Sequence, residues 1–507
     1  MNSTTRNSVR KWDVFEVTVK GPSDGNPFTD HHLSGCFEGA EEKVSADGFY
    51  DGDGLYRVRF MPSHEGEYRY TLKADFPLVP AQESGTFTVT APGAGNHGPV
   101  RVSDQYHFAY EDGTPYTSVG TTCYVWELQS EERRAETLAS LEEAGFNKIR
   151  FCVLPKHFDY NLRDPAMGFP YEGTPTDDSR LTMLNFHEYD QKANGSRFDY
   201  TRFRPEYFRN IENCIRKLMD LGIEADLIMM HPYDRWGFCC MTPEQDDLYW
   251  NYAAARFSAY RNVWWSLANE YDILQAKTEN DWERYASILV KKDPYHHLRS
   301  IHNNIRMYDY SRPWVTHCSV QGDPKDTAAL REKFGKPVVM DEVRYEGNIP
   351  WSWGNITAQE LVRRLWDCAV QGGYPGHGET YDTDGVLWWS HGGKLRGESW
   401  KRVKFLEKVM SEVPGHGIRL IRDQNRIMIA GAESERDLPD EEKSFFLYYY
   451  EDMQPAAGYL DLPEGKTFRV ELLDTWNGTI RDLGEYSGKQ FIRMPGKQYM
   501  ALRVTRV

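Results

Sequence analysis

The stretch NVWWSLANEYD, residues 262–272, contains an apolar run that ends at an amide and a carboxylate. Five of the six residues from Val263 to Ala268 are apolar or aromatic, which is typical of a strand buried on both faces. Asn269 and Glu270 follow directly, where we expect the strand to end. In a parallel β/α barrel the carboxyl ends of the strands carry the functional groups, so this stretch predicts both a fold class and a site.

Short apolar runs alternate with amphipathic helical segments on both sides of this stretch, from about residue 104 to residue 416. Nearly every apolar run is followed by a helical segment, as in an eight-stranded β/α barrel. A doubly wound open sheet is the alternative. We predict strands at residues 116–120, 147–154, 223–232, 263–268, 298–303, 314–320, 337–342 and 385–390.

Segments with a period of two residues flank this region. Apolar and polar side chains alternate between glycine-rich turns in residues 8–90, and the pattern returns after residue 416. The segment APGAGNHGP, residues 91–99, is typical of a linker, and no helix follows its GxGxxG string. We predict an α/β fold, a (β/α)8 TIM barrel flanked by two small β-sandwich domains. The predicted domains are residues 1–95, 96–415 and 416–507.

The composition argues against several kinds of partner. The 507-residue chain has a formal net charge of −16, which repels nucleic acid and anionic membranes, so we expect a neutral substrate instead. No apolar run is long enough for a transmembrane helix, and the N-terminus lacks the apolar segment of a signal peptide. The eight cysteines form no CxxC pair. We expect a cytoplasmic protein with reduced thiols. The question of whether the chain forms a homo-oligomer is left open.

Two glutamates stand at the ends of predicted strands that face each other across a barrel. Glu270 follows the fourth strand and Glu342 ends the seventh. Such a pair is what glycoside hydrolysis requires, because one carboxyl protonates the leaving oxygen while the other attacks the anomeric carbon or activates water. Arg150 in the second strand would keep Glu342 ionised. Asp341 is the competing carboxylate, but strand alternation points it away from Glu342.

These residues resemble glycoside hydrolase clan A, the retaining β/α-barrel glycosidases, through SLANE in the fourth strand and VVMDE in the seventh. The segments FDYTRFRPEYF, HPYDRWGF and GGYPGHGETY are similar to the apiosidase-like and cellulase-like barrels of that clan, which often carry β-domains at both ends. The resemblance implies that Glu342 is the nucleophile, Glu270 the acid/base, and Asn269 a ligand of the sugar 2-hydroxyl. It implies binding roles for Arg150 and His231.

Further binding residues are expected at other strand ends. The resemblance implies Trp388 or Trp389 as a sugar platform. Because side chains alternate along a strand, only one of the two points inward, and we choose Trp389. Many clan members have a tyrosine two residues after the histidine of the sixth strand, whereas His317 is followed by Cys318 and Ser319, so Tyr345 is the candidate replacement. The other candidates for substrate contact are Tyr233, His317, His377, Glu379 and Trp126.

The sequence therefore predicts a retaining glycosidase that cleaves O-glycosidic bonds of oligosaccharides or plant-type glycans and uses no cofactor. The alternatives are a non-catalytic carbohydrate-binding protein on a barrel scaffold and a transglycosylase. No HxH or HExxH motif occurs, so we expect no metal site. The identity of the sugar is not predicted, because one fold serves many substrates.

Overall fold

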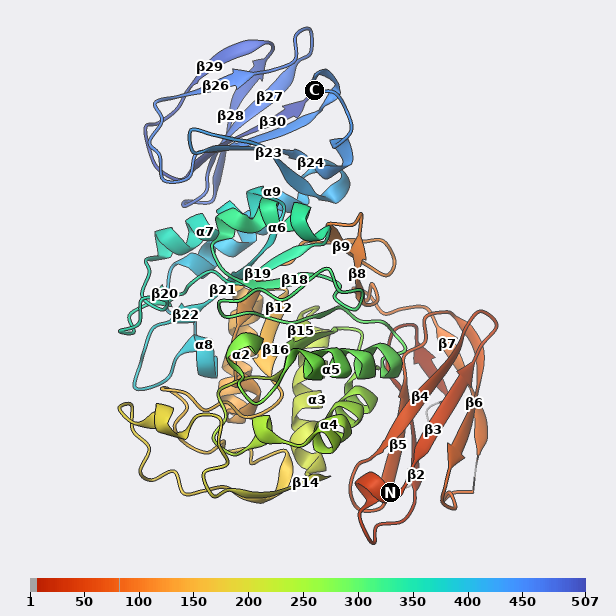
Figure 1. Ribbon diagram of the computed structural model, residues 1–507. Helices are drawn as coiled ribbons and strands as arrows, with labels where there is room; N and C mark the ends of the chain where they lie inside the picture. The colour runs from red at the N-terminus through yellow and green to blue at the C-terminus, as the bar shows by residue number, and fades with distance from the viewer. Residues whose placement is uncertain (1–6, 82) are drawn as a thin grey trace.

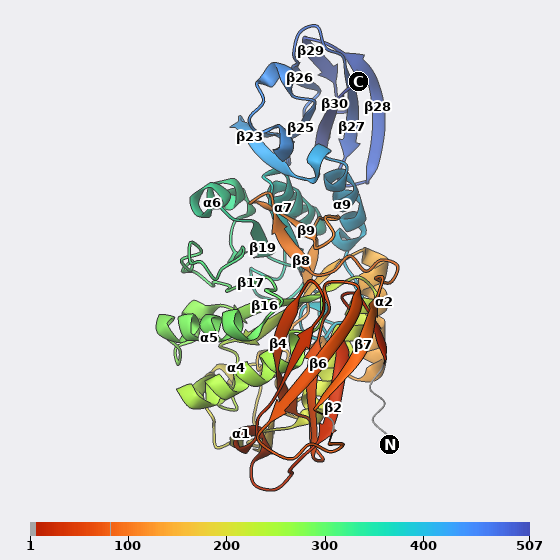
Figure 2. The same ribbon diagram turned by 90° about the vertical axis from the view of Figure 1, so that its right-hand side faces the viewer.

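The structure of this chain is a computed structural model that describes residues 7–81 and 83–507 (Figure 1). A β-sheet near the N-terminus, a central sheet surrounded by helices and a β-sheet near the C-terminus follow one another along the chain. The two outer sheets lie against different sides of the central part, as both views show (Figures 1 and 2). The division at residues 95 and 415 stays a prediction.

The N-terminal sheet has seven strands in the order β1-β7-β6-β3-β4-β5-β2. Phe15 on β2 and Phe87 on β7 are far apart in that order, yet their ring centroids are 3.7 Å apart. The sheet therefore folds over into two layers around an aromatic core. A short helix, α1 (Pro27–Asp30), follows β2. The strands are β1 (Ser8–Arg10), β2 (Phe15–Lys20), β3 (Leu33–Glu38), β4 (Lys43–Tyr50), β5 (Leu55–Phe60), β6 (Gly66–Ala74) and β7 (Ser84–Thr90).

Eight parallel strands form the central sheet, in the order β17-β16-β15-β12-β11-β21-β19-β18. Taken as a ring, this is the chain order, and an isolated parallel bridge between His302 and Ser319 joins the two ends of the sheet. The sheet thus curls nearly into a closed barrel, as predicted, and is not a doubly wound sheet. The strands are β11 (Gly120–Thr122), β12 (Lys148–Cys152), β15 (Glu224–Met230), β16 (Val263–Ala268), β17 (Arg299–Ser300), β18 (Cys318–Gln321), β19 (Val338–Glu342) and β21 (Tyr374–His377).

Helices surround this sheet, and local sequence sets where they begin and end. Ser130 caps α2 by accepting a hydrogen bond from the Arg133 amide, and Gly145 ends it in the left-handed conformation. Thr242 and Gln245 form a reciprocal capping box at the start of α4. The helices are α2 (Glu131–Ala144), α3 (Pro205–Asp220), α4 (Pro243–Phe257), α5 (Glu279–Lys292), α6 (Thr327–Phe334), α7 (Ala358–Val370), α8 (Trp388–His391) and α9 (Val403–Ser411).

A small antiparallel sheet closes the amino end of the barrel. It consists of β8 (Val100–Ser103), β9 (His107–Tyr110) and β10 (Pro115–Tyr116). Phe108 of β9 packs against Trp264 and Tyr374, with centroid distances of 5.2 and 4.8 Å. Both aromatic residues stand near the amino ends of their strands. The barrel is therefore plugged at this end, and the carboxyl ends of the strands are left to form a pocket.

The predicted eighth strand at residues 385–390 is wrong. The eighth strand of the barrel is β21, in the segment YPGH, and Trp388–His391 form the short helix α8. Glycine and proline give β21 a weak strand signal, but packing requires the glycine. A Cβ atom at Gly376 would lie 2.3 Å from the Asp341 carbonyl oxygen on the neighbouring strand. The close approach of the two backbones thus requires a glycine here, despite its low strand propensity.

The sixth strand was also placed too early, at residues 314–320. The observed strand, β18, covers Cys318–Gln321. His317 therefore precedes the strand and lies toward the plugged end, where its ring centroid is 5.9 Å from Phe108 and 5.2 Å from Trp264. The carboxyl end of the strand is occupied by Gln321 instead.

Three pairs of short strands complete the description of the loops and the C-terminal region. The long segment between β12 and α3 contains the hairpin of β13 (Tyr171–Thr174) and β14 (Arg197–Phe203). Beyond the carboxyl ends of β19 and β21, β20 (Glu346–Gly347) pairs with β22 (Glu379–Thr380). The third pair, β26 (Ala457–Asp461) and β29 (Lys489–Arg493), covers one face of the C-terminal sheet through Leu460 and Ile492.

The C-terminal sheet has six antiparallel strands in the order β23-β24-β25-β30-β27-β28. Its second face packs on the barrel, where the Tyr449 ring of β25 meets the Trp366 ring of α7 at a centroid distance of 5.6 Å. Within the described ranges, the helices fall short of the length and apolarity that a membrane span needs. The strands are β23 (Ile418–Gln424), β24 (Ile427–Ala432), β25 (Phe445–Tyr449), β27 (Phe468–Asp474), β28 (Thr479–Tyr486) and β30 (Met500–Arg506).

Candidate active site

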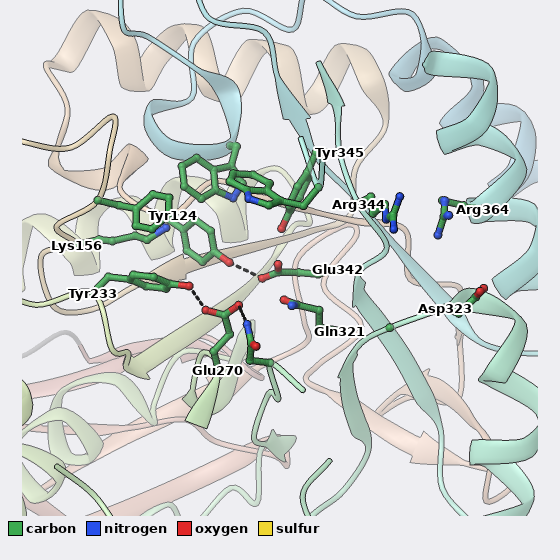
Figure 3. A pocket seen from close by; sticks show the side chains of 15 residues that line it. Tyr124, Lys156, Tyr233, Glu270, Gln321, Asp323, Glu342, Arg344, Tyr345 and Arg364 are labelled. Atoms are coloured by element: carbon green, nitrogen blue, oxygen red, sulfur yellow. Dashed lines mark hydrogen bonds between the residues drawn. The ribbon is translucent and has the colours of Figure 1, made fainter. Parts of the chain in front are cut away.

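Glu270 and Glu342 lie together in a pocket of about 440 Å³ at the carboxyl end of the barrel (Figure 3). Glu342 is the last residue of β19, and Glu270 comes two residues after the end of β16. With the amide of Gln321 turned so that its nitrogen faces the acids, this nitrogen is 3.2 Å from Glu270 Oε1 and 2.9 Å from Glu342 Oε2. Those two oxygens are thus at most 6.1 Å apart, the sum of the two distances.

Donors and cations surround the Glu342 carboxylate, which is only 7% exposed. Burial alone would raise its pKa, but the His302 ring, Arg150 and a hydrogen bond from Tyr124 outweigh burial and lower the pKa below its ordinary value. Arg150 Nη1 is 3.1 Å from Glu342 Oε1. Burial lowers the pKa of His302 to about 3, so at neutral pH its ring is uncharged and Arg150 is the permanent cation. Glu342 is held ionised.

Glu270 has the opposite electrostatic environment. Burial and the neighbouring charge of Glu342 raise its pKa to about 7. Its two oxygens accept hydrogen bonds from the Tyr233 hydroxyl and, at 2.7 Å, from Asn304 Nδ2. The backbone at Glu270 is in the left-handed region, with φ of 50°, which turns the chain sharply after the strand. Two carboxyls in one pocket with pKa values pushed apart are suited to act as base and acid.

Asn269 contacts two of the residues that surround Glu342. Its Oδ1 accepts hydrogen bonds from Arg150 Nη2 at 2.8 Å and from the Tyr124 hydroxyl at 3.2 Å. Its Nδ2 is buried and has no hydrogen-bond partner among the described residues. An unpaired buried donor is costly, so this group is available for a ligand hydroxyl.

Aromatic rings form one wall of the pocket around the ammonium of Lys156. Its Nζ is 3.8 Å from the ring centroid of Tyr124 and 3.9 Å from that of Trp389, and it also lies over Phe158 and Tyr233. Burial lowers the pKa of Lys156 to about 8. The choice of Trp389 over Trp388 matches this arrangement, since Trp389 lines the pocket whereas Trp388 donates to Thr121.

Several candidates from the sequence lie outside this pocket. His317 packs at the plugged end of the barrel, and the ring of His377 lies 4.8 Å from Phe146 between centroids because His377 belongs to β21 and not to a loop. Glu379 accepts hydrogen bonds from the amides of Arg396 and Gly397, at 2.7 and 2.8 Å, and so anchors a loop. These three are structural contacts in this arrangement.

Two other candidates also lie beneath the surface of the pocket. Trp126 is fully buried against Phe151, at a centroid distance of 5.7 Å. His231 donates from Nε2 to the Leu154 carbonyl oxygen at 3.1 Å, and burial lowers its pKa to about 4, so the ring is neutral. Its ring lies 6.3 Å from that of Tyr233, which does line the pocket.

Sequence reasoning missed a group of residues that line the pocket. Gln321 was missed because the predicted sixth strand ends at residue 320, one residue before Gln321, although a polar residue at a strand end is the expected signal. Asn304 lies one residue beyond the predicted fifth strand, residues 298–303. Tyr345, the candidate replacement named above, lines the pocket and helps to lower the pKa of Glu342, but among the described residues it is the Tyr124 hydroxyl that donates a hydrogen bond to this carboxylate. The missed lining residues are Tyr124, Lys156, Phe158, Asn304, Gln321, Gly322, Asp323, Arg344, Trp353 and Arg364.

The family described as "Apiosidase-like, catalytic domain" matches residues 102–414 of this chain. Two further families, described as "Domain of unknown function" (DUF5060 and DUF5605), match residues 8–75 and 435–505. The crystal structure of a presumed glycoside hydrolase from Bacteroides vulgatus ATCC 8482 is 36% identical, covers 99% of this chain and 100% of its own, and has a TM-score of 0.89.

A glycoside hydrolase of family 5 from the same organism is 16% identical and covers 81% of this chain and 93% of its own, with a TM-score of 0.59. At this identity the likeness concerns the fold alone. Among curated proteins, none matches the chain.

Proposed function

Because the chain belongs to the apiosidase-like family of catalytic domains, we propose that it is a retaining glycoside hydrolase with Glu342 as nucleophile and Glu270 as acid/base. One observation carries the proposal: two buried carboxyls share one pocket, and their surroundings move their pKa values in opposite directions. Retaining enzymes hold such a pair roughly 5–5.5 Å apart and inverting enzymes about 6.5–9.5 Å apart. The limit of 6.1 Å between Glu270 Oε1 and Glu342 Oε2 supports the retaining mechanism.

In the first step Glu342 attacks the anomeric carbon of the sugar while the bond to the leaving oxygen breaks. Glu270 gives its proton to that oxygen, which leaves as an alcohol, and a glycosyl ester of Glu342 remains. In the second step Glu270 takes a proton from water, the water oxygen bonds to the anomeric carbon, and the ester bond breaks. Glu342 is again a carboxylate and Glu270 is again protonated.

The neighbouring residues favour the protonation states that Glu342 and Glu270 need in these two steps. Arg150 stabilises the Glu342 carboxylate before attack and after release, and it also orients Asn269. The unpaired Nδ2 of Asn269 is placed to donate to a sugar hydroxyl beside the reacting carbon. Trp389 supplies an aromatic face within the same pocket.

The test is release of nitrophenol from a panel of aryl glycosides, covering pyranosides and furanosides of both anomers. Wild-type protein is compared with Glu342→Ala, and NMR of the first product follows the anomeric configuration. Activity that the variant lacks, with retained configuration, supports the proposal. Inverted configuration, or equal activity in the variant, contradicts it.

A further inference from the structure

The pocket is richer in cations than the rest of the molecule. The charged side chains that line it are Lys156, Arg344, Arg364, Glu270, Glu342 and Asp323. With Glu270 protonated, three cations face two anions, whereas the whole chain has a formal charge of −16. The overall charge led us to expect a neutral substrate, but a ligand responds to the potential inside the pocket that binds it.

Arg344 is presented to the pocket by an unusual backbone conformation. Its φ is 76°, in the left-handed region that non-glycine residues rarely adopt. Arg344 and Tyr345 follow one another in the chain and both line the pocket, which the alternation of an extended strand would not allow. No carboxylate among the described residues lies within 4 Å of the Arg344 guanidinium, so this cation has no ion-pair partner in the protein chain that the structure covers.

Arg364 reaches the same end of the pocket from α7, and Figure 3 shows both guanidinium groups on the side of Glu342 away from Lys156. Its Nε donates to Glu360 at 2.8 Å, and that carboxylate is shared with Arg363. The two Nη groups of Arg364 donate to no residue that the structure describes. The side chain is 14% exposed, so it is held in place yet retains free donors.

Two other charged side chains line the pocket, Asp323 near the two arginines and Lys156 on the other side of Glu342. Asp323 lies nearby, but its Oδ1 accepts from the Lys325 amide at 3.1 Å, and it forms no ion pair with either arginine in the described chain. Lys156, at the aromatic wall, is 3% exposed and has no carboxylate partner within 4 Å among the described residues. Its buried charge adds to the positive potential of the whole pocket.

We propose that Arg344 and Arg364 form a subsite for an acidic group of the substrate, a uronic acid carboxylate or a sulfate ester. The inference rests on the proposed function and narrows its substrate to acidic glycans. A guanidinium presents paired N–H donors that match two oxygens of a carboxylate or sulfate, which a neutral sugar hydroxyl does not. The second guanidinium adds charge, and the free Nη groups leave room for direct hydrogen bonds.

The experiment compares matched substrates. Polysaccharides that carry uronic acid groups are compared with their carboxyl-reduced forms, and sulfated polysaccharides with their desulfated forms, by release of reducing ends. The proteins are the wild type, Arg344→Gln, Arg364→Gln, the double variant, and Arg422→Gln as a control that loses one exposed charge far from the pocket. If wild-type cleavage falls after carboxyl reduction, the acidic group that the subsite binds is a carboxylate. If cleavage falls after desulfation, that group is a sulfate ester.

We expect kcat/KM of the wild type to be at least about tenfold higher for one acidic form than for its neutral partner, because charge-assisted bidentate hydrogen bonds are strong. Each single variant should lose most of this preference because activity falls more on the acidic form than on the neutral form, and Arg422→Gln should keep the preference. Equal cleavage of acidic and neutral forms by the wild type, or a preference unchanged in the double variant, overturns the inference while leaving the hydrolase proposal intact. Absence of cleavage of these glycans and of every aryl glycoside overturns both.

Discussion

The Arg150 guanidinium lies 3.1 Å from the Glu342 carboxylate within the barrel, and each is less than a tenth exposed. The two residues come from β12 and β19, which are separated by β11 and β21 in the sheet. Their side chains therefore meet across the inside of the barrel. Because a buried carboxylate without a counter-ion would take up a proton, this ion pair helps to keep Glu342 ionised, together with the hydrogen bond from Tyr124.

Replacing Glu342 by alanine should abolish turnover. If Glu342 is the nucleophile, the covalent step has no substitute, and we expect kcat to fall by about 10⁴-fold or more, which corresponds to about 5.5 kcal/mol of activation free energy. Aryl glycoside hydrolysis measures the loss. The circular dichroism spectrum should be unchanged, and activity within tenfold of the wild type in a folded variant would assign the nucleophile elsewhere.

Replacing Glu270 by alanine should give a different kinetic signature. The acid is needed most when the leaving oxygen is basic, so dinitrophenyl glycosides should lose much less activity than alkyl glycosides or glycans. Added azide should restore turnover and give a glycosyl azide of retained configuration, because azide attacks the glycosyl ester without a general base. Equal losses on all leaving groups and no effect of azide would exclude the acid/base role.

The fold was predictable where the burial pattern is strong. The strand that contains Trp264 and Trp265 and the strand that ends in Glu342 are buried on both faces, and their apolar runs are visible in the sequence. The strand β21 was not predicted, since the requirement for Gly376 comes from the Asp341 backbone on a neighbouring strand. Such a constraint exists only in three dimensions.

The two glutamates, Asn269 and Arg150 were predictable because they stand at or inside buried strands. The partners that surround them were harder to find, because they come from loops whose course the sequence pattern does not determine. Lys156 shows the limit: one lysine in a long polar segment gives no sign that four aromatic rings will surround it. His317 shows the converse: the predicted strand of residues 314–320 contains it, whereas β18 begins at Cys318 and leaves His317 on the amino side of the strand.

The pH dependence of activity should follow the two carboxyls. The first step needs Glu270 protonated and Glu342 ionised, so kcat/KM should fall as pH rises through about 7 and fall again below the ordinary glutamate range. The positive charge of Lys156 lowers the pKa of Glu270. In Lys156→Met the alkaline limb should therefore move to higher pH. The pH profile of kcat/KM on one aryl glycoside, measured for the wild type and the variant, tests this prediction. An alkaline limb that keeps its position or moves to lower pH contradicts the prediction.

The contact between the N-terminal sheet and the barrel should depend on Glu212 of α3, which is 1% exposed. It accepts hydrogen bonds from Arg59 of β5 at 2.7 and 3.0 Å and from Arg256 of α4 at 2.6 Å. Glu212→Ala leaves two buried guanidinium groups without this partner, so we expect the free energy of unfolding to fall by about 3–5 kcal/mol. Chemical denaturation measures the change, with Glu464→Ala, on an exposed loop, as the control.

The same carboxylate gives this contact a pH dependence with a defined sign. Burial would raise the pKa of Glu212, but Arg256 and Arg59 outweigh burial and lower it to about 2. A carboxyl whose pKa is lower in the folded state contributes stability above its unfolded value, near 4.5, and loses that contribution as pH falls toward 2. The stability difference between wild type and Glu212→Ala should therefore shrink across this window. A difference that is constant from pH 6 to pH 3 would show that the pair contributes nothing through its charge.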